Sequence, residues 1–348
     1  MKIKTLFVLL LVLLVACQEQ KPTPGIQEVW PTQSWSSNTP ESQGMDAAML
    51  EKGMEYIEQN NLALHSLLVI RHGVIISETY FSNYQADTLH ELWSVTKSFT
   101  STAVGIAKDQ GKLEDVEQKV LDFFPEQEFA NIDTRKESMR VRDLLTMTSG
   151  LDWVEGDSTF QAMYTSRDWV KFMLDLRMAG DPGSAFLYCS GCSHILSAIV
   201  QQTTGQNLGD FVRDNLFEPL GIKKYTWEAD AQGSSIGGWG LSLAPRDMAK
   251  LGYLYLHKGQ WEGQQVVSKE WVETATQKQV STEGEDGYGY QWWVFPEMGG
   301  YAALGMYGQT VFVAPAQDLI VVTTANEANH DRIFHLIQNF ILKAVQTP

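Results

Sequence analysis

The stretch Leu92-Trp93-Ser94-Val95-Thr96-Lys97 contains a Ser-x-x-Lys motif at the start of a segment with helical composition. Residues three positions apart on a helix share one face, so the Ser94 hydroxyl and the Lys97 amine can touch. A lysine can take the proton of a serine when burial lowers its pKa, and the apolar neighbours of the motif predict such burial. Because the motif alone can arise by chance, its meaning depends on the rest of the chain.

The composition is that of an acidic globular protein. The chain has 348 residues, 44% of them hydrophobic, which is enough for one large domain or two intergrown ones. Its 42 acidic and 26 basic residues give a formal net charge of −16. This charge argues against a nucleic-acid partner and against charge-driven adhesion to an anionic surface.

The N-terminus predicts an export signal. Lys2 and Lys4 precede an apolar run from Leu6 to Val15. That run is too short to span a bilayer of about 30 Å as a helix, and its basic start is typical of a signal peptide. We therefore interpret residues 1–17 as a signal peptide.

The end of this signal, Leu14-Val15-Ala16-Cys17, resembles a bacterial lipobox. The resemblance implies cleavage before Cys17 and lipidation of this cysteine; a plain secretory peptide is the alternative. Gln18 stands where inner-membrane lipoproteins carry aspartate. We therefore expect an exported lipoprotein on the periplasmic face of the outer membrane or on the cell surface. Residues 18–43, which are polar and Pro-rich, would form its tether to the membrane.

Two further cysteines, Cys189 and Cys192, follow in the main part of the chain. We interpret them first as small buried residues, second as a strained disulfide permitted by export, and last as a catalytic pair. Two cysteines without a histidine cluster make a poor zinc site. We expect neither a metal nor a cofactor.

The main domain, expected over residues 44–346, has strand-like segments at both ends and helix-like segments between them. Residues 66–70 and 74–81 predict a hairpin, and four short β-rich runs follow between 290 and 323. The economical assembly is an α+β fold, an α/β sandwich with one antiparallel sheet made from both chain ends and flanked by helices. An all-helical subdomain at about 96–240 would be inserted into it.

Two other segments could complete a site around Ser94. Tyr188-Cys189-Ser190 follows Pro182-Gly183 directly before a predicted helix, so the tyrosine could pass a proton to a leaving group. The glycine-rich segment 305–309 lies between β-rich runs, where its backbone could approach a substrate and help to bind an oxyanion. A packed tyrosine and a β-turn without a ligand are the respective alternatives.

Ser94-x-x-Lys97, Tyr188-x-Ser190 and the 305–309 segment occur in the order of the three motifs of the penicillin-recognising serine hydrolases. The chain resembles most the class C β-lactamase-like branch, which includes esterases and 6-aminohexanoate-dimer hydrolases. The similarity extends over about residues 41–345 and implies the β-lactamase/transpeptidase-like fold. Further matching segments are Arg71-His72-Gly73, 144–151, 182–188 and 246–252.

The resemblance implies a role for each matching residue. Ser94 would be acylated, Lys97 would take its proton, and Tyr188 would carry a proton to the leaving group. The backbone N–H groups of Ser94 and Gln309 would bind the oxyanion. The expected substrate-binding residues are Ser190, Met306, Tyr307, Gly308, Trp153, Tyr164 and Trp239.

Two positions depart from the family pattern. Ser190 replaces the usual Asn and is shorter, and Met306 replaces the usual Lys or His. Losing the cation removes the partner of the carboxylate shared by penicillins and peptidoglycan termini. We therefore expect a serine hydrolase that acts on a neutral ester or small amide. The alternatives are a catalytically silent binding or sensing module and, less favoured, a β-lactamase or D-alanyl-D-alanine carboxypeptidase.

Overall fold

The computed structural model describes residues 30–282 and 286–346. The predicted signal peptide and its Cys17 lie outside the described residues. Among the helices of the described ranges, none combines the length and the apolar character needed to cross a membrane.

An eight-stranded antiparallel sheet forms the centre of the domain, with the order β2-β1-β13-β12-β11-β10-β9-β8. Strand β1 (Leu64–Arg71) pairs with β13 (Leu319–Ala325), so both ends of the chain meet in one sheet. This confirms the predicted sheet. Its other strands are β2 (Val74–Tyr80), β8 (Val280–Ser281), β9 (Gly287–Tyr288), β10 (Trp293–Phe295), β11 (Gly300–Gly305) and β12 (Gln309–Ala314).

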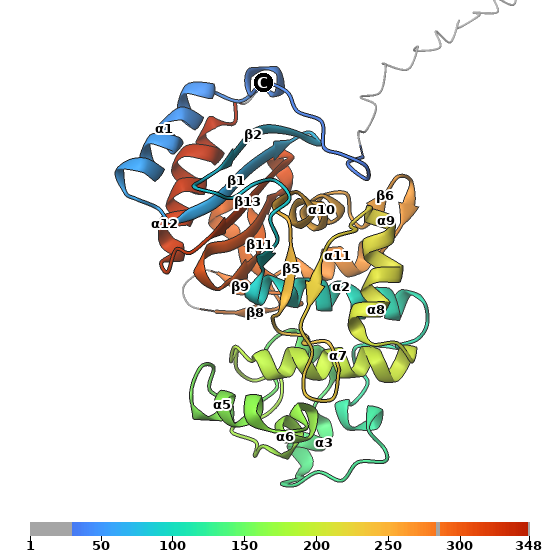
Figure 1. Cartoon of the computed structure of the whole chain (residues 1–348). Coiled ribbons are helices and arrows are strands. Elements are labelled where there is room, and N and C mark those ends of the chain that lie inside the picture. The colour runs from blue at the N-terminus through green and yellow to red at the C-terminus, as the bar shows by residue number, and fades with distance from the viewer. Residues whose placement is uncertain (1–29, 283–285, 347–348) are drawn as a thin grey trace, which may run out of the picture.

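Helices cover both faces of this sheet, with α1 (Ala47–Gln59) and α12 (His330–Leu336) on one face and α2 (Thr96–Asp109) and α10 (Pro245–Leu256) on the other (Figure 1). Successive side chains of a strand point to opposite faces. Leu67 and Val69 of β1 accordingly join the core under α1 and α12, whereas Leu68 and Ile70 join the core that α2 and α10 share. The sheet is therefore buried on both sides, which fixes its register.

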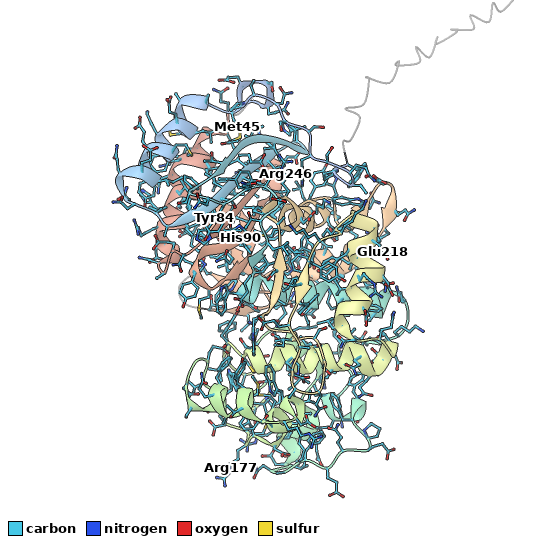
Figure 2. All side chains as sticks on the ribbon, in the orientation of Figure 1. Met45, Tyr84, His90, Arg177, Glu218 and Arg246 are labelled. Atoms are coloured by element: carbon cyan, nitrogen blue, oxygen red, sulfur yellow. A yellow bond between two sulfur atoms is a disulfide. The ribbon has the colours of Figure 1, made fainter. Side chains whose placement is uncertain are left out.

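Edge strand β2 is tied to α10 by an ion pair. Arg246, which is labelled in Figure 2, donates from Nε and Nη2 to the two carboxylate oxygens of Glu78, at 2.7 and 2.6 Å. The turn between β1 and β2 consists of His72 and Gly73, both with positive φ (50° and 74°), as a two-residue hairpin loop requires. His72 is exposed, as expected for a turn residue.

The inserted part of the chain is mainly helical, and α7 lies between the sheet and the outermost helices (Figure 1). Its helices are α3 (Thr134–Ser138), α4 (Val141–Leu145), α5 (Ser158–Thr165), α6 (Trp169–Asp175), α7 (Ser190–Thr204), α8 (Leu208–Val212) and α9 (Glu218–Leu220). The predicted α+β class is thus confirmed.

Some short elements were not predicted from the sequence. A three-stranded sheet joins β3 (His90–Glu91), β5 (Leu241–Leu243) and β4 (Thr226–Trp227), so the region 96–240 is not helical throughout. Strands of two or three residues carry too little periodicity to be recognised. The remaining elements near α10 are β6 (Gln260–Trp261), β7 (Gln264–Gln265) and α11 (Lys269–Ala275).

The prediction of a tether over residues 18–43 is wrong for residues 30–43, which the structure describes. Trp35 is buried, and its Nε1 donates to the carbonyl of Arg246 at 2.9 Å. The N–H of Ile75 in β2 donates to the carbonyl of Ser36 at 2.9 Å. From Trp30 onward, this segment therefore packs onto the domain. The proline content favoured an extended tether. Trp30 and Trp35, however, are large apolar side chains, and burying them favours a segment that packs on the domain.

Candidate active site

Ser94 lies in a short 3₁₀ turn, Trp93–Val95, that leads directly into α2 at Thr96. The backbone of this turn is fixed from two sides. The N–H of Leu92 donates to the carbonyl of Leu241 in β5 at 2.8 Å. On the other side, a Cβ at Gly305 would lie 2.1 Å from the carbonyl oxygen of Leu92, so only glycine lets β11 approach so closely.

Lys97 is buried one helical turn after Ser94, and its Nζ donates to the Ser94 Oγ at 2.8 Å. The side chain is 1% exposed. Burial lowers the pKa of Lys97 to about 8. A substantial fraction of the amine is therefore neutral near pH 8, as a general base must be.

Two further acceptors complete the surroundings of the amine. Lys97 Nζ donates to the Ser190 Oγ at 3.0 Å and to the carbonyl of Gly238 at 2.8 Å. Ser190 begins α7, whereas Gly238 lies in the loop before β5. Two segments distant in sequence thus hold the amine against Ser94.

Tyr188 lies on the same amine. Lys97 Nζ is 4.8 Å from the centre of the Tyr188 ring. The ring is half-buried and stacks on Trp293 of β10, with 5.9 Å between ring centres. Burial raises the pKa of Tyr188 well above its usual range. The phenol therefore keeps its proton at neutral pH and can donate it.

Glu155 also reaches this centre, and sequence reasoning missed it. Its Oε1 accepts from the Ser190 Oγ at 2.6 Å, and its Oε2 accepts from the Ser190 N–H at 2.9 Å. The buried indole of Trp153 donates to Oε2 at 2.9 Å. No motif marks Glu155; the only cue was an acidic residue within an aromatic-rich segment.

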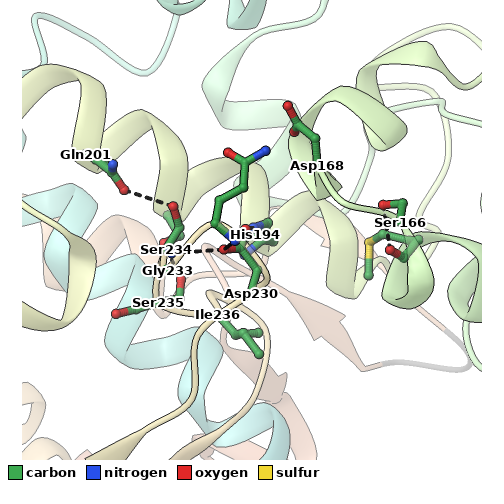
Figure 3. Close-up of polar contacts among 12 residues, drawn as sticks. Ser166, Asp168, His194, Gln201, Asp230, Gly233, Ser234, Ser235 and Ile236 are labelled. Carbon is green, nitrogen blue, oxygen red and sulfur yellow. Dashed lines mark hydrogen bonds and ion pairs between the residues drawn. The ribbon is translucent and has the colours of Figure 1, made fainter.

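The loop that carries Gly238 is held against α7. His194 Nε2 and Asp230 Oδ2 lie 3.1 Å apart, both with buried side chains (Figure 3). The Ser197 Oγ donates to the carbonyl of Ser235 at 2.6 Å. A Cβ at Gly238 would lie 2.9 Å from the carbonyl oxygen of Ser190, which leaves little room for a side chain. These contacts fix the carbonyl that accepts from Lys97.

The predicted oxyanion segment forms a turn between β11 and β12, beside the Ser94 turn. Gln309 is buried, and its Nε2 donates to the carbonyls of Met306 and Ala325 at 3.1 and 2.7 Å. Its side chain is thus engaged with the protein and stabilises the turn. The role of the Gln309 backbone N–H in binding an oxyanion remains a prediction.

The residues expected to bind substrate in this turn are mostly open to solvent. Met306 is 54% exposed and Tyr307 is 39% exposed, whereas Gly308 is buried. The Tyr307 ring meets Trp93 edge-on, with 5.5 Å between ring centres. The exposed face of the turn thus presents a thioether where the family pattern has a cation.

Three of the four aromatic residues expected to bind substrate, Trp153, Tyr164 and Trp239, gather in one cluster with Phe160 and Trp169. Trp153 contacts Phe160, and Trp239 stacks on Trp169 with 5.4 Å between ring centres. Trp153 and Trp239 are buried, and Tyr164 of α5 is exposed. The two tryptophans therefore support the loops around Glu155 and Gly238.

Cys189 and Cys192 form a disulfide, so the preferred interpretation as unpaired buried thiols is wrong. The residues lie one helical turn apart, and their Cα atoms are 5.3 Å apart, a separation that suits the bridge. Both cysteines are fully buried. The disulfide spans Ser190 and directly follows Tyr188, so it belongs to the scaffold of the site.

A cavity of about 580 Å³ adjoins Tyr188 through its stacking partner Trp293. Its walls are mainly apolar and belong to the end of the Tyr188 loop, to β10, β11 and to α12, whereas Ser281 of β8, Thr282 and Asp286 contribute polar groups. The apolar lining residues are Phe186, Trp293, Phe295, Leu304 and Phe334.

Comparison with known proteins shows which protein family the domain resembles. A family profile described as Beta-lactamase matches residues 48–344. The 6-aminohexanoate-dimer hydrolase of Paenarthrobacter ureafaciens is 28% identical over 302 residues, covering 80% of this chain and 76% of that protein. Penicillin-binding protein 4 of Amycolatopsis lactamdurans is 31% identical over 164 residues, covering 46% of this chain and 40% of that protein.

Solved structures share the fold. A Bacillus anthracis protein provisionally described as a 6-aminohexanoate-dimer hydrolase superimposes with a TM-score of 0.74 at 21% identity, over 91% of this chain and 88% of that chain. EstCE1, a hydrolase with promiscuous acyltransferase activity, gives a TM-score of 0.73 at 18% identity, over 86% and 99%. Because the family profile spans the domain from α1 to the last helical segment, the chain belongs to the Beta-lactamase family and is a serine hydrolase of that family.

Proposed function

We propose that this protein hydrolyses uncharged esters or small amides through an acyl-enzyme formed on Ser94. The observation that carries this proposal is the contact of the buried Lys97 Nζ with the Ser94 Oγ at 2.8 Å. A serine is activated when an adjacent base can take its proton, and burial has lowered the pKa of this amine to about 8.

The residues at the site can perform each proton transfer. The Ser94 Oγ forms a bond to the acyl carbon while its proton passes to Lys97. The bond to the leaving oxygen or nitrogen breaks, and that atom takes a proton from Tyr188, which regains one from Lys97. Water then attacks the acyl-enzyme and gives its proton to the same groups. The bond between the acyl carbon and the Ser94 Oγ then breaks, this oxygen takes up the proton that came from water, and the acid departs.

The charges around the site favour a neutral substrate. Met306 supplies no cation for a carboxylate, and Glu155 places a negative charge one hydroxyl away from Lys97. The cavity beside Tyr188 offers apolar walls to the rest of the substrate. Relatives are named as a dimer hydrolase and a carboxylesterase, so both amides and esters belong in the search for the substrate.

A substrate panel tests this proposal. Wild type, Ser94→Ala and Lys97→Met would be assayed on p-nitrophenyl esters, small amides and nitrocefin, with a fluorophosphonate probe to locate the nucleophile. We expect ester or amide turnover and probe attachment at Ser94, and loss of both in Ser94→Ala. Unlabelled wild type without turnover contradicts the proposal and favours the silent binding module. Hydrolysis of nitrocefin that depends on Ser94 favours the β-lactamase alternative.

We also propose that the enzyme is exported and anchored through a lipid on Cys17, which places it on the periplasmic face of the outer membrane or the cell surface. The lipobox-like sequence before Cys17 supports this location. Metabolic labelling with a fatty acid analogue is expected to mark wild type and not Cys17→Ser. Equal labelling of both proteins contradicts the anchor.

A further inference from the structure

The Ser190 hydroxyl accepts one hydrogen bond and donates another, and its two partners decide which way its proton points. A hydroxyl has one proton to donate and two lone pairs to accept with. The Ser190 Oγ accepts from Lys97 Nζ at 3.0 Å, and its own proton goes to the Glu155 Oε1 at 2.6 Å. Because a carboxylate only accepts, it fixes the orientation of this hydroxyl and turns a lone pair toward the amine.

We infer that Glu155 is a positioning residue of the catalytic centre, which acts through Ser190 to hold Lys97 against Ser94. The inference rests on the proposed function. It assigns to this exposed loop residue a task that its distance from Ser94 in the sequence does not suggest. It also accounts for the short side chain at position 190: serine and glutamate together replace the single longer amide of the family pattern.

The carboxylate of Glu155 is fully occupied by the protein. Besides the Ser190 hydroxyl, it accepts from the Ser190 N–H at 2.9 Å and from the indole of Trp153 at 2.9 Å. Ser190 is the first residue of α7, so the carboxylate also faces the positive end of that helix dipole. These contacts aim the carboxylate inward and favour a positioning role over direct binding of the substrate.

The charge of Glu155 acts on the same amine. The polar groups around Lys97 are Ser94 of its own segment, Tyr188, Ser190 and the carbonyl of Gly238, with Glu155 behind Ser190. Burial lowers the pKa of Lys97, and the charge of Glu155 opposes that shift. Removing this charge favours the neutral amine, so it moves the acidic limb of the pH profile to lower pH.

The test compares Glu155→Gln with Asp152→Asn. The control removes an equal charge from an exposed residue of the same loop. We expect kcat/KM of Glu155→Gln to fall about 10-fold to 100-fold. An amide has a single acceptor oxygen, and the N–H groups of Ser190 and Trp153 both donate to one side of the carboxylate, so the amide NH2 would face the Ser190 Oγ and could not accept its proton. Its acidic limb should move down by about 0.5 to 1 pH unit, which allows for the partial exposure of Glu155. Asp152→Asn should change neither quantity.

Ser190→Ala provides a second, independent variant. This variant removes the hydroxyl that links Glu155 to Lys97 and leaves the carboxylate charge in place. We therefore expect kcat/KM to fall about as much as in Glu155→Gln. Because the two residues act as one unit, the double variant should be no slower than the worse single variant. Additive losses contradict the inference.

Other outcomes also overturn it. An increase in KM alone, with kcat and the acidic limb unchanged, means that Glu155 binds substrate. A lower unfolding midpoint with unchanged kinetics means that it only stabilises the fold. If Ser94→Ala keeps full activity, the proposed function fails. If Ser94→Ala is inactive and Glu155→Gln behaves as wild type, only the role of Glu155 fails.

Discussion

Lys97, which donates to the Ser94 Oγ, lies over the ring of Tyr188, with the amine 4.8 Å from the centre of the phenol ring. Burial moves their pKa values in opposite directions, down to about 8 for Lys97 and far upward for Tyr188. A neutral amine and a protonated phenol can therefore exist together in slightly alkaline solution. This is the combination that a base and a proton donor require.

The pH profile of kcat/KM should follow Lys97. The general base must be neutral, so activity should be low below the pKa of the amine and rise as the pH passes about 8. The raised pKa of Tyr188 keeps the phenol protonated over this rise. Initial rates from pH 5 to pH 10 on a neutral ester measure the profile. A rate that is already constant from pH 5 contradicts the role of Lys97 as the base.

Tyr188→Phe separates the hydroxyl from the ring that stacks on Trp293. We expect kcat to fall about 10²-fold to 10⁴-fold on an alkyl ester, whose leaving oxygen needs a proton. The loss should be much smaller on a p-nitrophenyl ester, because nitrophenolate leaves without protonation. Equal losses on both esters would show that the hydroxyl does not serve the leaving group.

The disulfide should stabilise both the fold and the site. Replacing Cys189 and Cys192 together by alanine is expected to lower the free energy of unfolding by about 2 kcal/mol, the value for a short closed loop. It should also lower kcat, because the bridge spans Ser190 and adjoins Tyr188. Urea unfolding and ester hydrolysis measure both effects. In wild type treated with a reductant, the free energy of unfolding and kcat should both fall as well. If kcat of the double variant is unchanged, the disulfide has no role in the site.

His194→Ala tests the brace behind Gly238. Losing the buried contact with Asp230 should cost about 1 to 3 kcal/mol of stability. We expect kcat to fall as well, since the loop carries the carbonyl that accepts from Lys97 at 2.8 Å. His335→Ala, in an exposed position of α12, is the matched control. A destabilised variant with wild-type kcat would show that this loop does not act on Lys97.

Met306→Lys restores a cation to the turn before β12. Met306 is 54% exposed, so the longer charged side chain can be accommodated. Acylation by a carboxylate-bearing penicillin should become about 10-fold faster, as expected for a charge-assisted contact. Met306→Gln, which is polar and uncharged, controls for size. If both variants react alike, the missing cation cannot be the reason for the proposed preference for neutral substrates.

Several features of this protein could be predicted from the sequence alone, because they depend on residues that lie a few positions apart. Ser94 and Lys97 meet because three residues make about one helical turn, and the apolar run at residues 66–70 predicted a strand, which the structure buries on both faces. The turn at His72 and Gly73 and the end of α2 before Gly111 follow equally from local conformation. Such contacts form between residues a few positions apart, so the sequence alone is enough to predict them.

Contacts between distant segments were decided only by the tertiary structure. Glu155 and Ser190 are 35 positions apart, and Lys97 and Gly238 are 141 apart. The packing of Trp35 likewise escaped the sequence interpretation, which also ranked the disulfide of Cys189 and Cys192 second to buried unpaired residues. Each of these contacts depends on loop conformations that result from packing summed over the whole domain. The sequence thus predicted a nucleophile and its base in Ser94 and Lys97, and the fold showed the groups that hold these two side chains together.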